Sequence, residues 1–486
     1  MIGIQLDKQD FEYDVHSLVK AFYPKEEVKI YYEGEEKKEE FPFLIEVHYE
    51  EDQVRIRLNK AGQCIFDDTI ALDYVDRKIS KNKVKLLLYC GLQLESGQSL
   101  PWGNLTGIRP TKIAMGLLEK GYTNVQAANF MRENYLVSNQ KTALAIAIAN
   151  RERHILRDID YDRGYSLYVG IPFCPSICLY CSFSSFPLHV WKDRVDQYLD
   201  ALIKELEFIS RIMSDRVLDT IYIGGGTPTT LEPHQLRRLL DCLQKEFDLT
   251  TVKEYTVEAG RPDSITAEKL AVLREYPVTR ISVNPQTMNQ KTLDIIGRKH
   301  TAEDTVHAFH LAREAGFDNI NMDLIAGLPG EDAQMVSHTL DAVRELSPDS
   351  LTVHSLAVKR AARLRMFREE YEEMTFENNQ EIMDLAYGCA QDLQMSPYYL
   401  YRQKNMAGNL ENVGYARTGK EGIYNILIME EKQPIIAAGA GASTKLVFAN
   451  GSRIERVENV KDVTNYITRI DEMIERKRIG IAAYLK

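Results

Sequence analysis

Short apolar runs alternate with longer stretches of helical periodicity between residues 161 and 370. The runs are SLYVGI, TIYIGG, YTVEA, RISVN, NINMDLI and SLTVHS, which begin at Ser166, Thr220, Tyr255, Arg280, Asn319 and Ser350. Runs of this length with helices between them predict six parallel strands joined by right-handed crossovers. The pattern fits an open barrel or a doubly wound sheet, and in both a ligand site lies beyond the carboxyl ends of the strands.

The chain before and after this alternation follows other patterns. We therefore expect an N-terminal α/β domain, a partial (β/α)6 barrel domain and a C-terminal α+β domain, over residues 1–160, 161–370 and 371–486. In the first domain the segments Phe43 to Tyr49 and Gln53 to Leu58 alternate apolar and polar residues, which predicts a strand pair. The pattern turns helical after Asp67. A further helix is expected near the C-terminus, from Val460 to Arg478.

Two segments rich in glycine predict tight turns. Gly103, Gly107 and Pro110 predict a rigid turn, after which Thr111 caps a short helix. This segment contains no catalytic spacing, so we interpret it as structural. The segment from Gly439 to Ser443 follows an apolar strand and lacks the spacing of a dinucleotide fingerprint, which favours close backbone packing.

Composition narrows the class of protein. A chain of 486 residues with 44% hydrophobic and 27% charged residues is typical of a globular protein with several domains. The formal charge of −11 argues against a general nucleic-acid surface. The sequence has no transmembrane segment and no secretion signal, so we expect a cytoplasmic protein. Seven cysteines, four of them scattered, predict no disulfide framework and suit a reducing compartment.

The other three cysteines follow the first apolar run. Cys174, Cys178 and Cys181 have the spacing C-x3-C-x2-C. Three thiolates on one loop can hold a cubane iron–sulfur cluster by three irons and leave the fourth iron open for chemistry. A zinc site is an alternative, although zinc usually takes four protein ligands and no fourth cysteine or histidine lies nearby. Three unrelated buried cysteines are the other alternative.

Further notable residues stand at the ends of the other five predicted strands. They are the segment Gly224 to Thr229, Glu258, Gln286, Asp323 and Ala357. Because the carboxyl ends of parallel strands meet at one rim, we expect these residues to share a site with the cysteines. The three glycines let the backbone approach a ligand closely. Each polar residue taken singly is also explained as a structural hydrogen-bonding group.

The C-x3-C-x2-C and GGGTPT motifs together resemble the radical S-adenosylmethionine (SAM) enzymes, and among them the oxygen-independent coproporphyrinogen III oxidase family. The resemblance implies a partial barrel of the triose-phosphate-isomerase type, a 4Fe–4S cluster on the three cysteines, and SAM bound to the open iron. At the positions that match the family it implies SAM contacts from Tyr168, Tyr180, Gly225, Gly226, Thr227, Glu258, Gln286, Arg298, Asp323 and Ala357.

The flanking segments LPWGNLTGIRPTK and PYYLYRQKNMAGN are similar to the HemZ branch, which is named coproporphyrinogen dehydrogenase. This similarity implies oxidative decarboxylation of coproporphyrinogen III to protoporphyrinogen IX by a 5′-deoxyadenosyl radical. It also implies a low-potential electron donor such as flavodoxin or ferredoxin. A substrate with four carboxylates needs cations, for which the candidates are Arg261, Lys359, Arg360, Arg363, Arg402 and Lys404.

Phe183 stands where the best-studied dehydrogenases of the family carry a fourth cysteine, and haem-chaperone relatives have phenylalanine there too. The chaperones also carry an HNxxYW-like haem motif, for which the segment from Asn412 to Tyr415 offers no histidine. Two alternatives to the dehydrogenase stay open. One is a haem-binding or haem-trafficking radical SAM protein, and the other is a radical SAM enzyme that acts on another tetrapyrrole.

Overall fold

The computed structural model describes residues 1–34, 41–357, 362, 364, 374–403, 410–448 and 451–485. The chain forms two compact units, Met1–Asn150 and Arg151–Lys486. The division falls before the expected position at residue 160, because Leu156 and Ile159 pack with Tyr398 and Ile426 in the second unit. The boundary expected at residue 371 lies outside the described residues.

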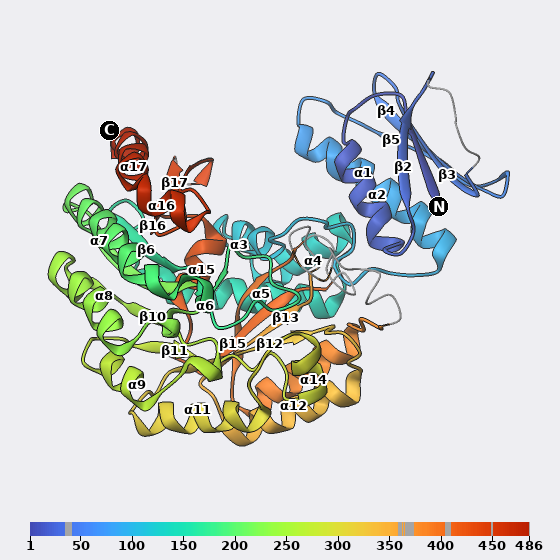
Figure 1. The fold of residues 1–486 in the computed structure, drawn as a ribbon. Helices are drawn as coiled ribbons and strands as arrows, with labels where there is room; N and C mark the ends of the chain where they lie inside the picture. Colours follow the sequence, from blue (N-terminus) through green and yellow to red (C-terminus); the bar gives the residue numbers. More distant parts are fainter. Residues whose placement is uncertain are drawn as a thin grey trace. The chain divides into compact units, whose positions relative to one another are not determined.

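An eleven-stranded sheet organises the second unit (Figure 1). Its centre consists of the six predicted strands, which are β6 (Gly164–Ile171), β9 (Val217–Gly225), β10 (Glu254–Glu258), β11 (Arg280–Ser282), β12 (Ile320–Ala326) and β13 (Ser350–Ser355). They are parallel, and each lies beside the next in chain order. A doubly wound sheet would reverse this order at a switch point. The uninterrupted order makes the sheet a partial barrel, as predicted.

Helices cover the outer face of these strands in chain order (Figure 1). They are α7 (Val195–Ile212), α8 (Pro233–Glu246), α9 (Ala267–Arg274), α11 (Ala302–Glu314), α12 (Ala333–Leu346) and α14 (Gln380–Asp392), with the short α6 (Leu188–Trp191) and α10 (Gln290–Ile295) in loops. In α8 the residues Leu236, Leu239, Leu240 and Leu243 recur at helical spacing and are buried. Their spacing gives the apolar stripe that holds the helix on the sheet.

The C-terminal residues extend the same sheet at both edges. The strands β14 (Ser396–Tyr401) and β15 (Asn412–Ala416) join beside β13, whereas β16 (Ile435–Ala438), β17 (Ser443–Phe448) and β18 (Arg453–Glu458) join beside β6. The remaining helices are α15 (Ile423–Glu430), α16 (Val463–Thr468) and α17 (Ile470–Leu485), the last two in place of one expected helix. At Gly439 φ is 108°, and a Cβ would lie 2.5 Å from the Gly170 carbonyl oxygen. The interpretation of this turn as close backbone packing is therefore confirmed.

The first unit contains a five-stranded sheet in the order β2-β1-β3-β4-β5. The strands are β1 (Ile2–Leu6), β2 (Val28–Tyr32), β3 (Phe43–Tyr49), β4 (Gln53–Lys60) and β5 (Gln63–Ala71). The helices are α1 (Glu12–Phe22), α2 (Arg77–Ser96), α3 (Thr111–Glu119), α4 (Asn124–Tyr135) and most of α5 (Asn139–Ile155), whose last residues belong to the second unit. The strand pair is confirmed. The helix expected after Asp67 begins only at Arg77, because the mostly exposed edge strand β5 has no apolar alternation to reveal it.

Two smaller features of the described residues bear on the sequence analysis. Pro110, rather than Thr111, is the N-cap of α3, and Thr111 is already inside the helix. No helix within the described ranges is long and apolar enough to cross a membrane.

Candidate cofactor site

The cysteine loop is fixed to the end of the first barrel strand by backbone hydrogen bonds. Cys174 ends the two-residue strand β7 (Phe173–Cys174), which pairs with β8 (Phe186–Pro187). The Gly226 N–H donates to the Ile171 carbonyl and the Thr227 N–H to the Phe173 carbonyl, each at 2.7 Å. A Cβ at Gly226 would lie 2.6 Å from the Phe173 carbonyl oxygen and 3.0 Å from Cys174 Sγ. Only glycine therefore allows the GGGTPT turn to lie against the cysteine loop.

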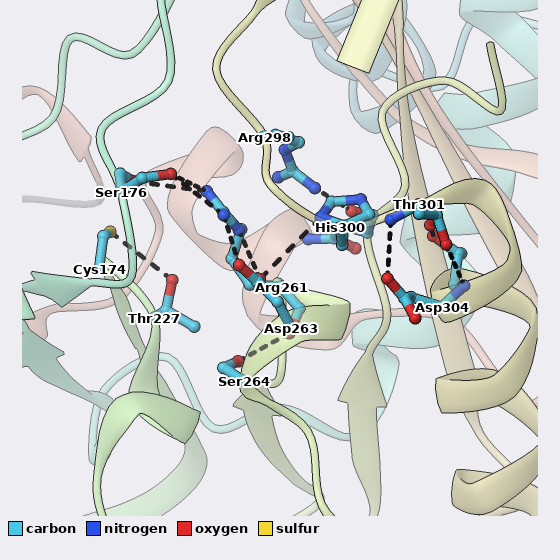
Figure 2. Close-up of polar contacts among 12 residues, drawn as sticks. Cys174, Ser176, Thr227, Arg261, Asp263, Ser264, Arg298, His300, Thr301 and Asp304 are labelled. Carbon is cyan, nitrogen blue, oxygen red and sulfur yellow. Dashed lines mark hydrogen bonds and ion pairs between the residues drawn. The ribbon is translucent and has the colours of Figure 1, made fainter. Parts of the chain in front are cut away.

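Each of the three cysteine sulfurs has a different polar neighbour. Thr227 Oγ1 donates to Cys174 Sγ at 3.6 Å, a contact shown in Figure 2. Arg261 Nη1 donates to Cys178 Sγ at 3.5 Å, and Ser185 Oγ lies 3.8 Å from Cys181 Sγ. These neighbours come from separate parts of the chain. The fold therefore places at least one hydrogen-bonding group beside every thiol.

Burial makes ionisation of the free thiols unfavourable. It raises the pKa of Cys174 to about 11, and the nearby thiols of Cys181 and Cys178 add to the effect, against a hydrogen bond from Thr227. Burial also raises the pKa of Cys181. Iron binds thiolates, so cluster assembly releases these protons.

The donor set fits a cluster better than a single metal ion. Among the residues that the structure describes, no group of three or more His, Cys, Asp or Glu side chains is placed to hold one ion. The ligands of a zinc ion must converge on one point, whereas a cubane takes each thiolate on a different iron. Three thiols spread over one loop, each beside a polar group, match the second requirement.

Two carboxylates face the inside of the barrel beside this loop. Tyr222 on β9 donates a hydrogen bond to Oε1 of Glu258 on β10. Burial raises the pKa of Glu258 to about 7, against this hydrogen bond and with a contribution from the charge of Asp323. Burial also raises the pKa of Asp323, but interactions with His354 and Asn321 outweigh it, so the net shift is downward.

A stack of three tyrosine rings lines the barrel next to Glu258. The rings of Tyr168 and Tyr222 are stacked with centroids 6.3 Å apart, and those of Tyr222 and Tyr424 with centroids 4.4 Å apart. Tyr168 comes from β6, whereas Tyr424 comes from α15 near the opposite end of the unit's sequence. The stack presents planar apolar surface with hydroxyl groups at its edges, which suits a planar organic ligand.

Sequence reasoning did not identify Tyr222, Tyr424, His354 or Tyr401 as site residues. Tyr222 lies two positions before Gly224 on the same strand, so strand alternation could have found it. His354 Nε2 lies 3.9 Å from Asp323 Oδ2, and Tyr401 OH lies 3.2 Å from His354 Nδ1. Tyr401 and Tyr424 reach the site from remote segments, and no local pattern marks them.

Arg298 supplies a buried cation beside Tyr180 and Cys178 of the cysteine loop. Its side chain is 6% exposed, and Nη1 donates to the Asn284 carbonyl. Its Nε has no hydrogen-bond partner within the described part of the chain. Burial lowers the pKa of Arg298, but Tyr180 and Cys178 outweigh it and the net shift is upward. A charged guanidinium with an unused buried donor is suited to an anionic ligand group.

Gln286 lies beside Asp323, since its backbone N–H donates to the Asp323 carbonyl at 3.0 Å. Its φ of 68° lies in the left-handed region, and its backbone forms a bridge to Leu324. Its side chain lines a cavity of about 10 Å³ between the sheet and the helices α12 and α14. Ala357 directly follows Leu356, whose N–H donates to the carbonyl of Ala326 at the end of β12, at 2.9 Å. Ala357 thus stands at the rim, as expected.

Arg261 was a candidate for binding substrate carboxylates, and the structure gives it a different position. It is 3% exposed, is paired with Asp263 at 2.7 Å, and points toward Ser176 of the cysteine loop (Figure 2). Burial lowers the pKa of Arg261, but Asp263 and Cys178 outweigh it and raise the pKa overall. Arg402 is also buried. The other candidates, Lys359, Arg360, Arg363 and Lys404, lie outside the described residues.

Comparisons with known proteins agree with this geometry. Residues 168–343 match the model of the radical SAM superfamily. The chain is 41% identical over 401 residues to the oxygen-independent coproporphyrinogen-III oxidase-like protein HemZ of Bacillus subtilis, over 82% of this chain and 80% of HemZ. It is 33% identical to the heme chaperone HemW of the same organism, over 63% of this chain and 76% of HemW.

The fold is also that of a solved relative. Coproporphyrinogen III oxidase (HemN) from Escherichia coli aligns with a TM-score of 0.52 and 24% identity, over 66% of this chain and 73% of HemN. Radical SAM proteins use a 4Fe–4S cluster and SAM, and the three thiols at the strand end are the donors that such a cluster requires. The chain belongs to the radical SAM superfamily and, within it, to the oxygen-independent coproporphyrinogen III oxidase family as a HemZ-like member.

Proposed function

We propose that this protein decarboxylates coproporphyrinogen III oxidatively to protoporphyrinogen IX without oxygen. The observation that carries the proposal is that the cysteine loop and the GGGTPT turn lie against each other at the end of a polar barrel interior. The loop and turn are held together by hydrogen bonds from Gly226 and Thr227, and the interior contains Glu258, Arg298 and Asp323. The extent of the similarity to HemZ supports the same substrate class.

We assign the cluster to Cys174, Cys178 and Cys181. The Arg298 guanidinium would bind the carboxylate of SAM through its free donor. The backbone of Gly225, Gly226 and Thr227, together with Glu258, would receive the amino group, and Asp323 the ribose hydroxyls. Tyr168, Tyr180, Gln286 and Ala357 stay predictions as SAM contacts.

Bound together, the cluster and SAM supply a 5′-deoxyadenosyl radical when one electron arrives from a low-potential donor. The chain would hold a propionate side chain of the substrate where it would lose a hydrogen atom to the radical, and then carbon dioxide and one electron to an external one-electron acceptor, so that a vinyl group is left. The residues of this chain orient the reactants and exclude water. Glu258 and the tyrosine stack beside it would lie against the bound reactants.

The test is an anaerobic assay of the cluster-reconstituted protein with dithionite, SAM and coproporphyrinogen III. We expect a vinyl-bearing product to form together with 5′-deoxyadenosine. Cys178→Ala should abolish both products, whereas Cys389→Ala, a buried cysteine on α14, should retain both. 5′-Deoxyadenosine without a porphyrin product would refute the substrate and leave the radical SAM chemistry intact.

A second candidate function is haem binding or trafficking. Phe183 favours it, because this side chain is 73% exposed near the cysteine loop and replaces the cysteine expected of a dehydrogenase. Stoichiometric haem binding by the anaerobic protein, without turnover of coproporphyrinogen III, would support this candidate over the dehydrogenase.

A further inference from the structure

Arg261 is fixed against the cysteine loop by contacts on both sides of its guanidinium. On one side Asp263 accepts hydrogen bonds from Nε at 2.9 Å and from Nη2 at 2.7 Å. On the other side Nη1 donates to the Ser176 carbonyl at 3.3 Å, to Ser176 Oγ at 3.2 Å and to Cys178 Sγ at 3.5 Å. The Asp263 carboxylate thus accepts two hydrogen bonds from the guanidinium, and this bidentate pairing fixes the direction of the guanidinium. The guanidinium is therefore held with one edge on Asp263 and the other on the loop.

The contact to Cys178 differs in kind from those to the other two sulfurs. Cys174 and Cys181 have neutral hydroxyl groups as neighbours, from Thr227 and Ser185. Cys178 has the Arg261 guanidinium, which stays charged at any working pH and is 3% exposed. The buried Arg298 also interacts with Cys178, through its charge and a side-chain hydrogen bond. A hydrogen bond from a charged donor is about twice as strong as one between neutral groups. Cys178 is consequently the sulfur on which the protein exerts the strongest polar influence.

We propose that Arg261 is a positioning residue for the iron–sulfur cluster, whose reduction potential it raises through its hydrogen bond to the Cys178 sulfur. The inference rests on the proposed function, because it requires the cluster on Cys174, Cys178 and Cys181. On reduction the cluster gains one electron from the external donor and becomes more negative, with no bond made or broken at Arg261. A cation and a hydrogen bond at a ligand sulfur stabilise that more negative state.

The nearby ion pair limits the effect without cancelling it. Asp263 carries a compensating negative charge, but it lies on the far side of the guanidinium from Cys178. The directed N–H donor faces the sulfur, so the local interaction remains favourable to added negative charge. Arg261 could instead act only by holding Ser176 in the loop. Changing Arg261 would then cause loss of iron but leave the reduction potential of the remaining cluster unchanged.

The experiment is a redox titration of the cluster, followed by electron paramagnetic resonance, in reconstituted protein without SAM. For Arg261→Gln we expect a lower midpoint potential. At a fixed potential, the ratio of reduced to oxidised cluster should fall about tenfold, which corresponds to about 59 mV for a one-electron couple. Arg261→Lys keeps the charge but loses the planar guanidinium with its bidentate hydrogen bonds. Its midpoint potential should therefore lie between those of the wild type and Arg261→Gln.

Ser185→Ala is the matched control, because it removes a neutral neighbour from the sulfur of Cys181 at 3.8 Å. We expect its midpoint to move less than that of Arg261→Gln. An unchanged midpoint in Arg261→Gln at full iron content would overturn the proposal. If Arg261→Gln binds no cluster, Arg261→Lys decides, and a midpoint no lower than that of the wild type rejects the proposal. Absence of the cluster from the wild-type protein would instead refute the proposed function.

Discussion

The hydroxyl group of Tyr222 donates a hydrogen bond to Oε1 of Glu258 across the neighbouring parallel strands β9 and β10. The bond holds a carboxyl group whose pKa burial raises to about 7, and the bond itself favours the ionised form. Because a cationic ligand group binds the carboxylate and not the acid, the protonation state of Glu258 would affect the SAM contact that we propose for it.

The pH dependence of stability should reveal this carboxyl group. Its pKa is raised on folding, so the native state holds a proton that the unfolded chain releases between about pH 4.5 and about pH 7. The contribution of Glu258 to stability therefore falls as pH rises through that window, with a slope of at most about 1.4 kcal/mol per pH unit. Urea unfolding of the wild type and Glu258→Gln without cofactors measures it as the difference between the two proteins.

Tyr222→Phe should move this window upward, because the lost hydrogen bond favoured the ionised carboxyl group. Tyr424→Phe is the control, since its ring stacks on Tyr222 while the hydrogen bond to Glu258 comes from Tyr222. A window at the same pH in Tyr222→Phe and wild-type protein would contradict the assignment.

Arg298→Ala should weaken SAM binding and leave the iron content unchanged. Loss of a hydrogen bond to a charged group costs about 1.5–3 kcal/mol, which is roughly a tenfold to hundredfold rise in Kd. Equilibrium binding of SAM and iron analysis of the same samples measure both quantities. Arg237→Gln, on the exposed side of α8, should change neither. Loss of iron in Arg298→Ala would assign the residue to the loop instead.

Gly226→Ala should reduce cluster incorporation. The added Cβ meets the Phe173 carbonyl oxygen at 2.6 Å and Cys174 Sγ at 3.0 Å, so the loop must shift. Overpacking of this kind typically costs about 1–3 kcal/mol. Gly388→Ala in α14 has no neighbouring atom within 4 Å and should stabilise the protein by up to about 1 kcal/mol. Iron per chain and the free energy of unfolding test both variants, and full iron in Gly226→Ala would contradict the close approach.

The buried pair of Lys477 and Glu205 should be a major element of stability. Both side chains are 0% exposed, and Nζ lies 2.6 Å from Oε1. Lys477→Met leaves the Glu205 charge buried without its counter-ion and should cost about 3–5 kcal/mol of unfolding free energy. Arg476→Gln, on the same helix α17, breaks an exposed pair with Glu472 and should cost at most about 1 kcal/mol. Equal losses in urea unfolding would reject this difference.

The alternation of apolar runs and helices determined the central six strands, because buried parallel strands need continuous apolar segments whatever surrounds them. The cysteine spacing and the glycine turn were equally local. Both lie at strand ends, and the parallel order places all strand ends of one kind at a single rim. The pattern alone therefore predicted six parallel strands, in an open barrel or a doubly wound sheet, and the rim at which the cysteine loop and the glycine turn lie.

Only the tertiary structure decided which side chains face the inside of the barrel and what they contact. Tyr424 joins the tyrosine stack from α15, and Arg261 donates a hydrogen bond to Cys178. The edge strand β5 escaped prediction because both of its faces are largely exposed. These features depend on contacts between residues far apart in the chain. Packing selects such contacts, whereas a local pattern of residue types records only which segments are apolar.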